Sequence, residues 1–328
     1  MFRKLSLVFL ALALFLVACA PAATPAPAPT TVQPTEAVAP APTDVPAPVA
    51  ETFTDGLGRE VSLTLPAQKI VSIAPSNTEL IFAVGAGTQV IGRDTFSDYP
   101  AEALALPDMG SGYPSYNVEA IIALEPDLVL GSPLTAPEQI QALADQGLNV
   151  YVLPNPKTLD DLYLNLLTVG KLTGHEAEAA ALVDGLQARV KAVTEKTASV
   201  QEKPLVFYEL DASQDANAPW TTGPGTFMEM LLGLAGARNA GSVLQGEWAT
   251  ISREELLQQD PDFILLGDAL YGGVTPEAVA ARPGWETLTA VKEGRVYEFD
   301  DNTVSRPGPR MVDGLESLAK LLHPELFK

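Results

Sequence analysis

The side chains that most often do chemistry in proteins are scarce in this 328-residue chain. Cys19 is the single cysteine, and His175 and His323 are the only histidines. A catalytic zinc site needs about three such ligands, and nucleophilic catalysis needs a thiol or hydroxyl beside a base. The glycine pairs Gly85-Ala-Gly87 and Gly223-Pro-Gly225 lack the remaining spacing of a dinucleotide- or phosphate-binding loop. We therefore expect a protein that is not an enzyme and carries no metal or cofactor.

Carboxylates, in contrast, occur in a repeated phrase. The stretches Asn117–Gly131 and Ser252–Gly267 each have an N-cap residue, a glutamate two positions later, a Pro-Asp pair and an apolar run ending in glycine. Each phrase predicts a short helix, a turn and a buried strand. The glutamates are Glu119 and Glu254. A carboxylate near a helix N-terminus is favourable by about 0.3–1 kcal/mol, which explains each glutamate but not its matching place in both copies.

A long predicted helix separates the two copies. In His175–Ala198, apolar residues recur at spacings of three and four, with charged residues between them. At 1.5 Å per residue the helix would be roughly 35 Å long. His175 precedes this helix and His323 follows the last predicted helix, so both histidines are expected at helix ends.

Strands and helices alternate on both sides of that helix. Lys69–Ala74, Thr88–Gly92 and Asn149–Leu153 are predicted strands before it, and Pro204–Leu210 and Gly294–Phe299 are predicted strands after it. This order predicts an α/β fold with parallel sheets covered by helices. We expect an N-terminal lobe over 51–174, an interlobe helix over 175–200 and a C-terminal lobe over 201–328.

The first fifty residues have another character. Residues 1–18 carry Arg3 and Lys4 before an apolar run too short for a comfortable membrane span, which is typical of a secretory signal. The run ends in Leu16-Val17-Ala18-Cys19, which resembles a bacterial lipobox, so Cys19 is the predicted lipidation site. Residues 19–50 are mainly Ala, Pro and Thr, and predict a disordered tether. We expect an extracytoplasmic protein that the lipid on Cys19 anchors to the outer face of the cytoplasmic membrane.

The formal net charge is −21. So acidic a chain is a poor partner for nucleic acid or anionic lipid headgroups, but it is compatible with an uncharged or cationic ligand.

Five stretches together carry a family resemblance over residues 69–323. They are Ile73-Ala-Pro-Ser-Asn-Thr-Glu-Leu80, Phe96-Ser-Asp-Tyr-Pro100, Leu124-Glu-Pro-Asp-Leu-Val129, Trp248-Ala-Thr-Ile-Ser-Arg-Glu254 and Arg306-Pro-Gly-Pro-Arg310. The chain resembles the substrate-binding lipoproteins of ABC importers for cobalamin, ferric siderophores and haem, and is most similar to the cobalamin binders. The resemblance implies two Rossmann-like lobes joined by one rigid helix, as in class III periplasmic binding proteins, with little closure on binding.

The resemblance also implies a ligand-binding cleft between the lobes. Its motif positions place five side chains there: Phe96, Tyr113, Trp220, Trp248 and Arg306. Aromatic faces suit a large flat corrinoid ligand. Two of these residues stand in predicted loops, Trp220 in Asp211–Gly225 and Trp248 in Ala237–Ala249. In the family, one glutamate from each lobe binds arginines of the membrane permease, and Glu119 and Glu254 occupy these positions.

Two positions depart from the cobalamin binders. Ser132 stands where they have another tryptophan, and Asn302-Thr303 replaces an Asp-Trp pair. The cleft is therefore expected to be less aromatic than in the cobalamin binders. The resemblance implies a corrinoid as the ligand, and a ferric siderophore or haem is the alternative. The expected partners are a permease dimer with its ATPase subunits, and the protein itself is expected to be a monomer. A surface adhesion or signalling lipoprotein on the same scaffold remains a further alternative.

Overall fold

The computed structural model describes residues 49–112 and 115–328. The predicted signal sequence, Cys19, nearly all of the tether and Tyr113 lie outside these residues. Strand β1 begins at Val49, two residues before the predicted start of the N-terminal lobe. In the described part of the chain no helix combines the length and apolar character needed to span a membrane.

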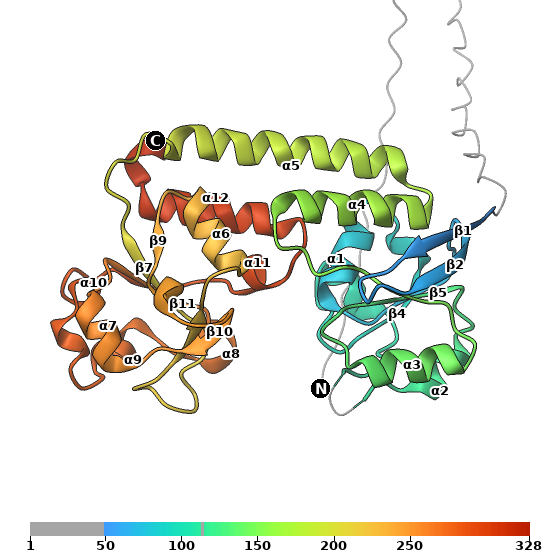
Figure 1. Cartoon of the computed structure of the whole chain (residues 1–328), viewed down its shortest axis with the longest axis horizontal. Helices are drawn as coiled ribbons and strands as arrows, with labels where there is room; N and C mark the ends of the chain where they lie inside the picture. Colours follow the sequence, from blue (N-terminus) through green and yellow to red (C-terminus); the bar gives the residue numbers. More distant parts are fainter. Residues whose placement is uncertain (1–48, 113–114) are drawn as a thin grey trace, which may run out of the picture. The chain divides into compact units, whose positions relative to one another are not determined.

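Each lobe contains a four-stranded parallel sheet (Figure 1). The N-terminal sheet has the order β4-β3-β5-β6. The C-terminal sheet has the order β12-β11-β7-β9. Numbered along the chain within each lobe, both sheets have the order 2-1-3-4, so the two lobes share one topology. The strands are β3 (Ile70–Ser72), β4 (Val90–Arg93), β5 (Leu128–Gly131), β6 (Val150–Val152), β7 (Leu205–Glu209), β9 (Arg238–Asn239), β11 (Phe263–Leu266) and β12 (Val296–Glu298).

The repeated phrase forms the same structure in both lobes. It folds as helix α2 (Val118–Ala123) followed by β5, and as helix α7 (Arg253–Gln259) followed by β11. The N-cap side chain of each helix accepts a hydrogen bond from the backbone N–H three residues later. The residue before each Pro-Asp pair has a left-handed backbone, with φ 50° at Glu125 and φ 49° at Asp260.

The aspartate of each Pro-Asp pair connects the phrase to the neighbouring central strand. The side chain of Asp127 accepts hydrogen bonds from the backbone N–H groups of Gln68 and Lys69, just before β3. In the same way, the side chain of Asp262 accepts one from Leu205 at the start of β7. The sequence repeat thus fixes where two adjacent strands begin in each sheet.

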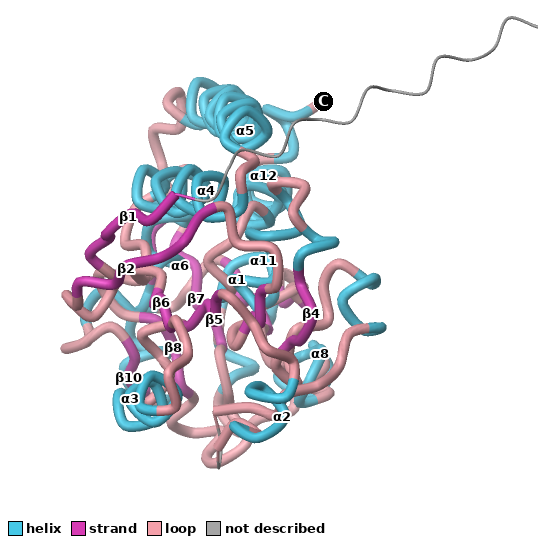
Figure 2. The backbone as a smooth tube through the Cα atoms, turned by 90° about the vertical axis from the view of Figure 1, so that its right-hand side faces the viewer, coloured by secondary structure: helices cyan, strands magenta, loops and turns pink. Residues whose placement is uncertain are grey.

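Helices α4 (Leu159–Thr173), α5 (Glu176–Thr197) and α12 (Arg310–Leu322) form a layer above both lobes (Figures 1 and 2). The predicted long helix is α5, and the chain passes from one lobe to the other through it. Gly174, with φ 77°, ends α4 in a left-handed conformation. Gly170 permits close packing of α4 on α5, because an added Cβ there would lie 2.5 Å from the Cβ of Ala179.

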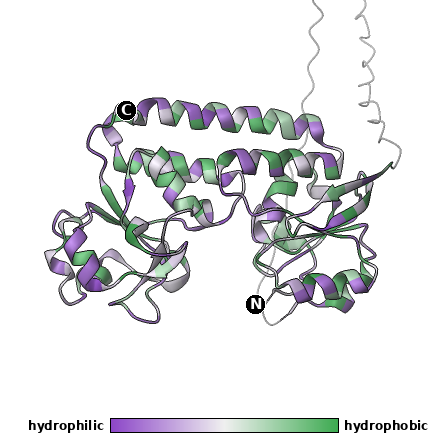
Figure 3. Cartoon of the chain, in the orientation of Figure 1, coloured by the Kyte–Doolittle hydropathy of each residue, from purple (hydrophilic) through white to green (hydrophobic). Residues whose placement is uncertain are grey.

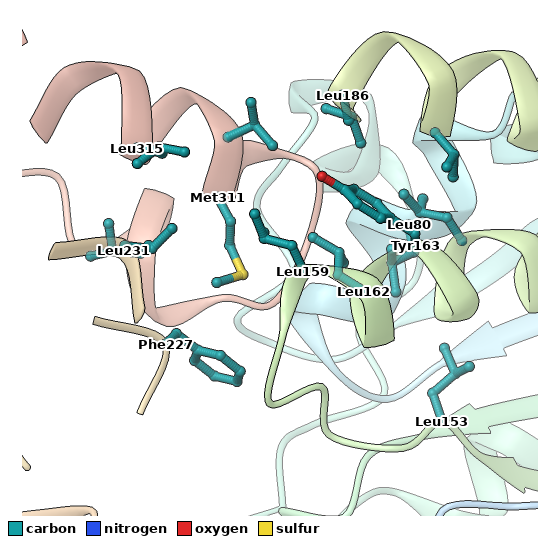
Figure 4. Close-up of a cluster of buried hydrophobic side chains, with 14 of the residues drawn as sticks. Leu80, Leu153, Leu159, Leu162, Tyr163, Leu186, Phe227, Leu231, Met311 and Leu315 are labelled. Atoms are coloured by element: carbon teal, nitrogen blue, oxygen red, sulfur yellow. The ribbon is translucent and has the colours of Figure 1, made fainter. Parts of the chain in front are cut away.

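One buried hydrophobic cluster extends from lobe to lobe under this layer (Figure 4). Leu159 and Leu162 of α4 lie beside Met311 of α12 in it, and Tyr163 and Leu315 belong to the same cluster. Leu186 of α5, Leu80 of α1 (Pro75–Ala83) and Leu231 of α6 (Phe227–Leu234) belong to the same cluster. The lobes therefore share a packed core in addition to the covalent link through α5.

Two short antiparallel pairs complete the strands. The first is the hairpin of β1 (Val49–Thr54) with β2 (Glu60–Leu65). The second pair, β8 (Trp220–Thr222) with β10 (Trp248–Thr250), lies in stretches that were expected to be loops. Its three-residue strands are too short to show a recognisable alternation.

Figure 3 shows α5 with alternating hydrophilic and hydrophobic residues along its length, as the periodicity predicted.

The remaining helices cover the sheets or lie in the segments that follow the strands. The helices not yet given are α3 (Pro137–Asp145), α8 (Ala269–Gly272), α9 (Pro276–Ala280), α10 (Thr289–Lys292) and α11 (Asn302–Ser305).

Helix α4 offers a matched test of the shared core. Leu162 is fully buried in the cluster, whereas Leu164, two residues on, is 61% exposed. We expect Leu162→Ala to lower the free energy of unfolding by about 2–5 kcal/mol, because it removes apolar contacts and leaves a cavity. Leu164→Ala should change it by roughly 0.5 kcal/mol or less. Urea denaturation measures both, and equal losses would contradict the packing described.

Candidate functional site

The loops after the strands of the N-terminal sheet meet a loop of the C-terminal lobe around a cavity of about 390 Å³. Because parallel strands have their carboxyl ends at one edge of the sheet, loops far apart in sequence come together there. The N-terminal lobe contributes residues that follow β3, β4 and β5. The C-terminal lobe contributes Ser305, Arg306 and Pro307. The cavity is therefore bounded by both lobes, as expected for a ligand-binding cleft.

Phe96 and Arg306 are the two predicted site residues that line this cavity. Phe96 follows β4 and is 61% exposed, which is unusual for a large aromatic side chain. Tyr113 lies outside the described residues, but Gly112 and Tyr116, on either side of it, both line the cavity. The hydroxyl of Tyr116 donates a hydrogen bond to the carbonyl of Ile73 at 2.8 Å, which fixes its ring at the cavity wall.

Most of the other cavity residues were not predicted as site residues from the sequence, and Leu134 and Asp94 are two of them. Leu134, in the loop after β5, is 86% exposed. Asp94, directly after β4, is buried and accepts a hydrogen bond from the Ser97 hydroxyl. Burial raises the pKa of Asp94, and the hydrogen bond from Ser97 offsets part of this shift. The signal available for Leu134 was a large apolar residue three positions after a buried strand. Asp94 is one of many aspartates in predicted loops.

Trp220 and Trp248 lie on the β8–β10 pair rather than in the 390 Å³ cavity. In the antiparallel register Trp248 is opposite Thr222 and Trp220 is opposite Thr250, so the two indoles share one face of the pair. Trp248 is 44% exposed and lines a small hollow with Lys157 of the N-terminal lobe. Trp220 is half-buried. The structure thus places Trp248 at a second contact between the lobes.

The guanidinium of Arg306 is paired with carboxylates of the other lobe. Its Nη1 lies 2.5 Å from Asp98 Oδ1 and 3.6 Å from Glu79 Oε1. Glu79 is a buried residue of α1, and it also accepts two hydrogen bonds from Arg310 at 2.9 and 2.5 Å. Burial raises the pKa of Glu79, while the two arginines act in the opposite direction. These four residues form the interlobe ion cluster.

Lys157, which lines the small hollow with Trp248, is also beside a carboxylate. Lys157 Nζ lies 3.9 Å from Glu247 Oε1, across the lobes, and both side chains are exposed. A larger groove of about 720 Å³ lies between α1, α5 and α12. It contains the ion pairs of Arg310 with Glu79 and of Arg189 with Asp313. We place the ligand site at the 390 Å³ cavity, because that is where the strand ends of the N-terminal sheet converge.

Glu119 and Glu254 are exposed residues in the first turns of α2 and α7. Both helices lie on the side of their lobe away from α5 (Figure 1). A hydrogen bond from the backbone N–H of Glu254 and one from Arg253 lower the pKa of the Glu254 carboxyl. The two carboxylates are therefore equivalent surface groups, one on each lobe.

Comparison with known proteins agrees with this geometry. The family model described as periplasmic binding protein matches residues 70–303. The chain belongs to the periplasmic binding protein family. It is 35% identical to an uncharacterized ABC transporter substrate-binding lipoprotein of Bacillus subtilis, over 84% of this chain and 87% of that protein.

Solved structures of the family have the same fold. The periplasmic vitamin B12 binding protein of Vibrio cholerae is 25% identical, with a TM-score of 0.67, over 80% of this chain and 99% of that one. A periplasmic haem binding protein of the same organism is 26% identical, with a TM-score of 0.70, over 78% and 99%. The predicted family and two-lobed α/β fold are confirmed, and the chain is a binding protein rather than an enzyme.

The interlobe ion cluster provides a test of how the lobes are held. Glu79→Gln keeps the shape of the side chain but leaves Arg310 and Arg306 without their shared buried anion. We expect the free energy of unfolding to fall by about 3–5 kcal/mol, as when one partner of a buried pair is removed. Asp313→Asn is the control, because its ion pair with Arg189 is about half exposed and should contribute at most about 1 kcal/mol. Equal denaturation midpoints for the two variants would refute a structural role of Glu79.

Proposed function

We propose that this protein captures a corrinoid in the cleft between its lobes and delivers it to the permease of an ABC importer. Exposed Phe96 and Leu134 and half-exposed Trp248 offer apolar faces from loops and short strands around the cleft. Such surfaces fit a bulky ring system, and aromatic side chains lose little conformational entropy when they bind. Among proteins of known binding activity, the vitamin B12 binder of Vibrio cholerae has this fold.

The pairing of Arg306 is the observation that carries the choice of ligand. Its charge is already balanced by Asp98 and Glu79, and Lys157 lies beside Glu247. A ligand with several negative charges, such as haem with its carboxylates or a ferric catecholate, requires cations that are not already paired. A corrinoid with uncharged amide arms does not. A ferric siderophore or haem remains the second candidate because a haem binder of Vibrio cholerae shares the fold.

The choice can be tested by titrating the protein with cyanocobalamin, haemin and a ferric catecholate siderophore in a calorimeter. We expect cyanocobalamin to bind most tightly. Trp248→Ala should weaken its binding by about tenfold or more, because tryptophans at the centre of a contact contribute strongly. Leu164→Ala, an exposed apolar change on α4, is the control and should leave binding unchanged. Tighter binding of haemin or the catecholate would replace the corrinoid by the second candidate.

We also propose that Glu119 and Glu254 bind the permease, one on each side of the cleft. Their equivalent positions in the repeat support this role, since a permease built from two similar subunits would meet two similar surfaces. The lipid on Cys19 would keep the protein at the membrane, and residues 19–50 would give it reach. A surface adhesion or signalling protein would have no use for a matched pair of permease contacts.

For docking, the informative variant is Glu119→Ala with Glu254→Ala. We expect normal ligand affinity in solution but loss of ligand uptake by cells, because exposed charges steer and align a partner. The control is Glu138→Ala with Glu277→Ala, which removes exposed first-turn glutamates from other helices of the same two lobes. Uptake should persist in the control. Undiminished uptake by the first variant would exclude the docking role.

A further inference from the structure

The four charged residues of the interlobe ion cluster divide into two pairs. Arg310 donates two hydrogen bonds to Glu79, at 2.9 and 2.5 Å, and its guanidinium lies over the ring of Tyr99, 4.0 Å from the ring centroid. Arg306 is within ion-pair distance of Glu79, at 3.6 Å, but it donates its hydrogen bond to Asp98, at 2.5 Å. Glu79 is therefore neutralised mainly by Arg310. The charge of Arg306 is balanced mainly by Asp98.

The two carboxylates differ in how deeply they are buried. The side chain of Glu79 is 1% exposed, whereas that of Asp98 is 53% exposed. Removing a buried partner leaves an uncompensated charge in the interior, but removing a half-exposed partner costs little stability, because water solvates the charge that is left. Asp98 can therefore balance the charge of Arg306 without deciding whether the two lobes stay together.

Arg306 is the member of its pair that reaches the ligand cavity. It lines the 390 Å³ cavity, and Asp98 is not among the described residues that do so. The charge of Arg306 acts within the cavity. Burial raises the pKa of Asp94, which also lines the cavity, and Arg306 is one of the groups that act against this rise. The charge that the cavity presents to a ligand thus depends on how far Arg306 is balanced from behind.

Without the carboxylate of Asp98, the cavity wall would contain a guanidinium whose charge is no longer balanced by its hydrogen-bond partner. Guanidinium groups bind carboxylates through charge-assisted hydrogen bonds, which are roughly twice as strong as hydrogen bonds between neutral groups. Asp94 would remain on the same wall, where it accepts a hydrogen bond from Ser97. Its negative charge would limit the attraction for an anion without removing it.

We propose that Asp98 sets the ligand selectivity of the cleft: it keeps Arg306 neutralised and so excludes ligands that carry carboxylate groups. This inference rests on the proposed function. It assigns the exclusion of anionic ligands to one half-exposed side chain in the loop after β4. Phe96, two residues earlier in the same loop, lines the cavity as an apolar contact, whereas Asp98 is a positioning residue that acts through Arg306.

Asp98→Asn removes the charge and keeps the size of the side chain. Calorimetric titration measures the affinity for haemin, which carries carboxylates, and for cyanocobalamin, whose amide arms are uncharged. We expect the ratio of haemin affinity to cyanocobalamin affinity to rise roughly tenfold over that of the wild type, because a charge-assisted hydrogen bond becomes available to haemin. Asp98→Ala should raise the ratio at least as far. Asp184→Asn, which removes the same charge from the exposed face of α5, should leave it unchanged.

A double variant identifies the group that is responsible. Adding Arg306→Gln to Asp98→Asn should return the ratio to about the wild-type value, because the gain depends on that guanidinium. A rise that persisted in the double variant would come from a changed loop and would refute the role of Arg306. The urea denaturation midpoints of both Asp98 variants should stay close to that of the wild type, unlike that of Glu79→Gln.

The outcomes separate this inference from the proposed function. If the wild type binds neither probe, the proposed function fails. If it binds cyanocobalamin but neither Asp98 variant raises the ratio above that of Asp184→Asn, the selectivity role of Asp98 alone is refuted. A wild type that prefers haemin would overturn both. Either Asp98 variant decides the matter if the other does not fold, and failure of both to fold would contradict the separation of selectivity from stability.

Discussion

The position of the two lobes depends on the buried carboxylate of Glu79. It comes from α1 of the N-terminal lobe and binds Arg310 and Arg306 of the C-terminal lobe. Removing these charges from water costs several kcal/mol per ion, so the cluster contributes much less net stability than the attraction between its charges alone would give. Its geometry is nevertheless specific, because a planar guanidinium and a carboxylate make two parallel hydrogen bonds in only one relative orientation. We infer that Glu79 fixes how the lobes are oriented more than how tightly they are joined.

The shared hydrophobic core also helps to fix the orientation of the two lobes. Buried side chains of α4, α6 and α12 pack together beneath α5. Packed interiors resist deformation, since any shift opens voids or forces overlaps. A cleft closed by flexible crossing strands can open widely, but a cleft bounded by this continuous core has little freedom at its hinge. We infer that the stiffness that the family resemblance implied for one helix would come from three helices and the ion cluster together.

The fold was predictable because its signals are local. The repeated phrase contains its own N-cap, turn and strand, and all three are found in both lobes. The β8–β10 pair could not be predicted in the same way, because Trp220 and Trp248 are brought together by pairing across 28 residues. The site was only partly predictable for the same reason. Phe96 and Arg306 do line one cavity, but nothing near Arg306 in the sequence indicates that Glu79, more than two hundred residues earlier, is beside it.

That long-range pairing changes the chemistry of the cleft. From the sequence alone, Arg306 is a cation that could bind an anionic ligand. In the folded chain, Asp98 and Glu79 of the opposite lobe balance its charge. In the C-terminal lobe, Arg282 is likewise paired with the buried carboxylate of Glu209. If the fold left these arginines unpaired, the same residue types would favour an anionic ligand. The selectivity of such a cleft thus follows from which charges the fold has already paired, and only the side chains left over are available to a ligand.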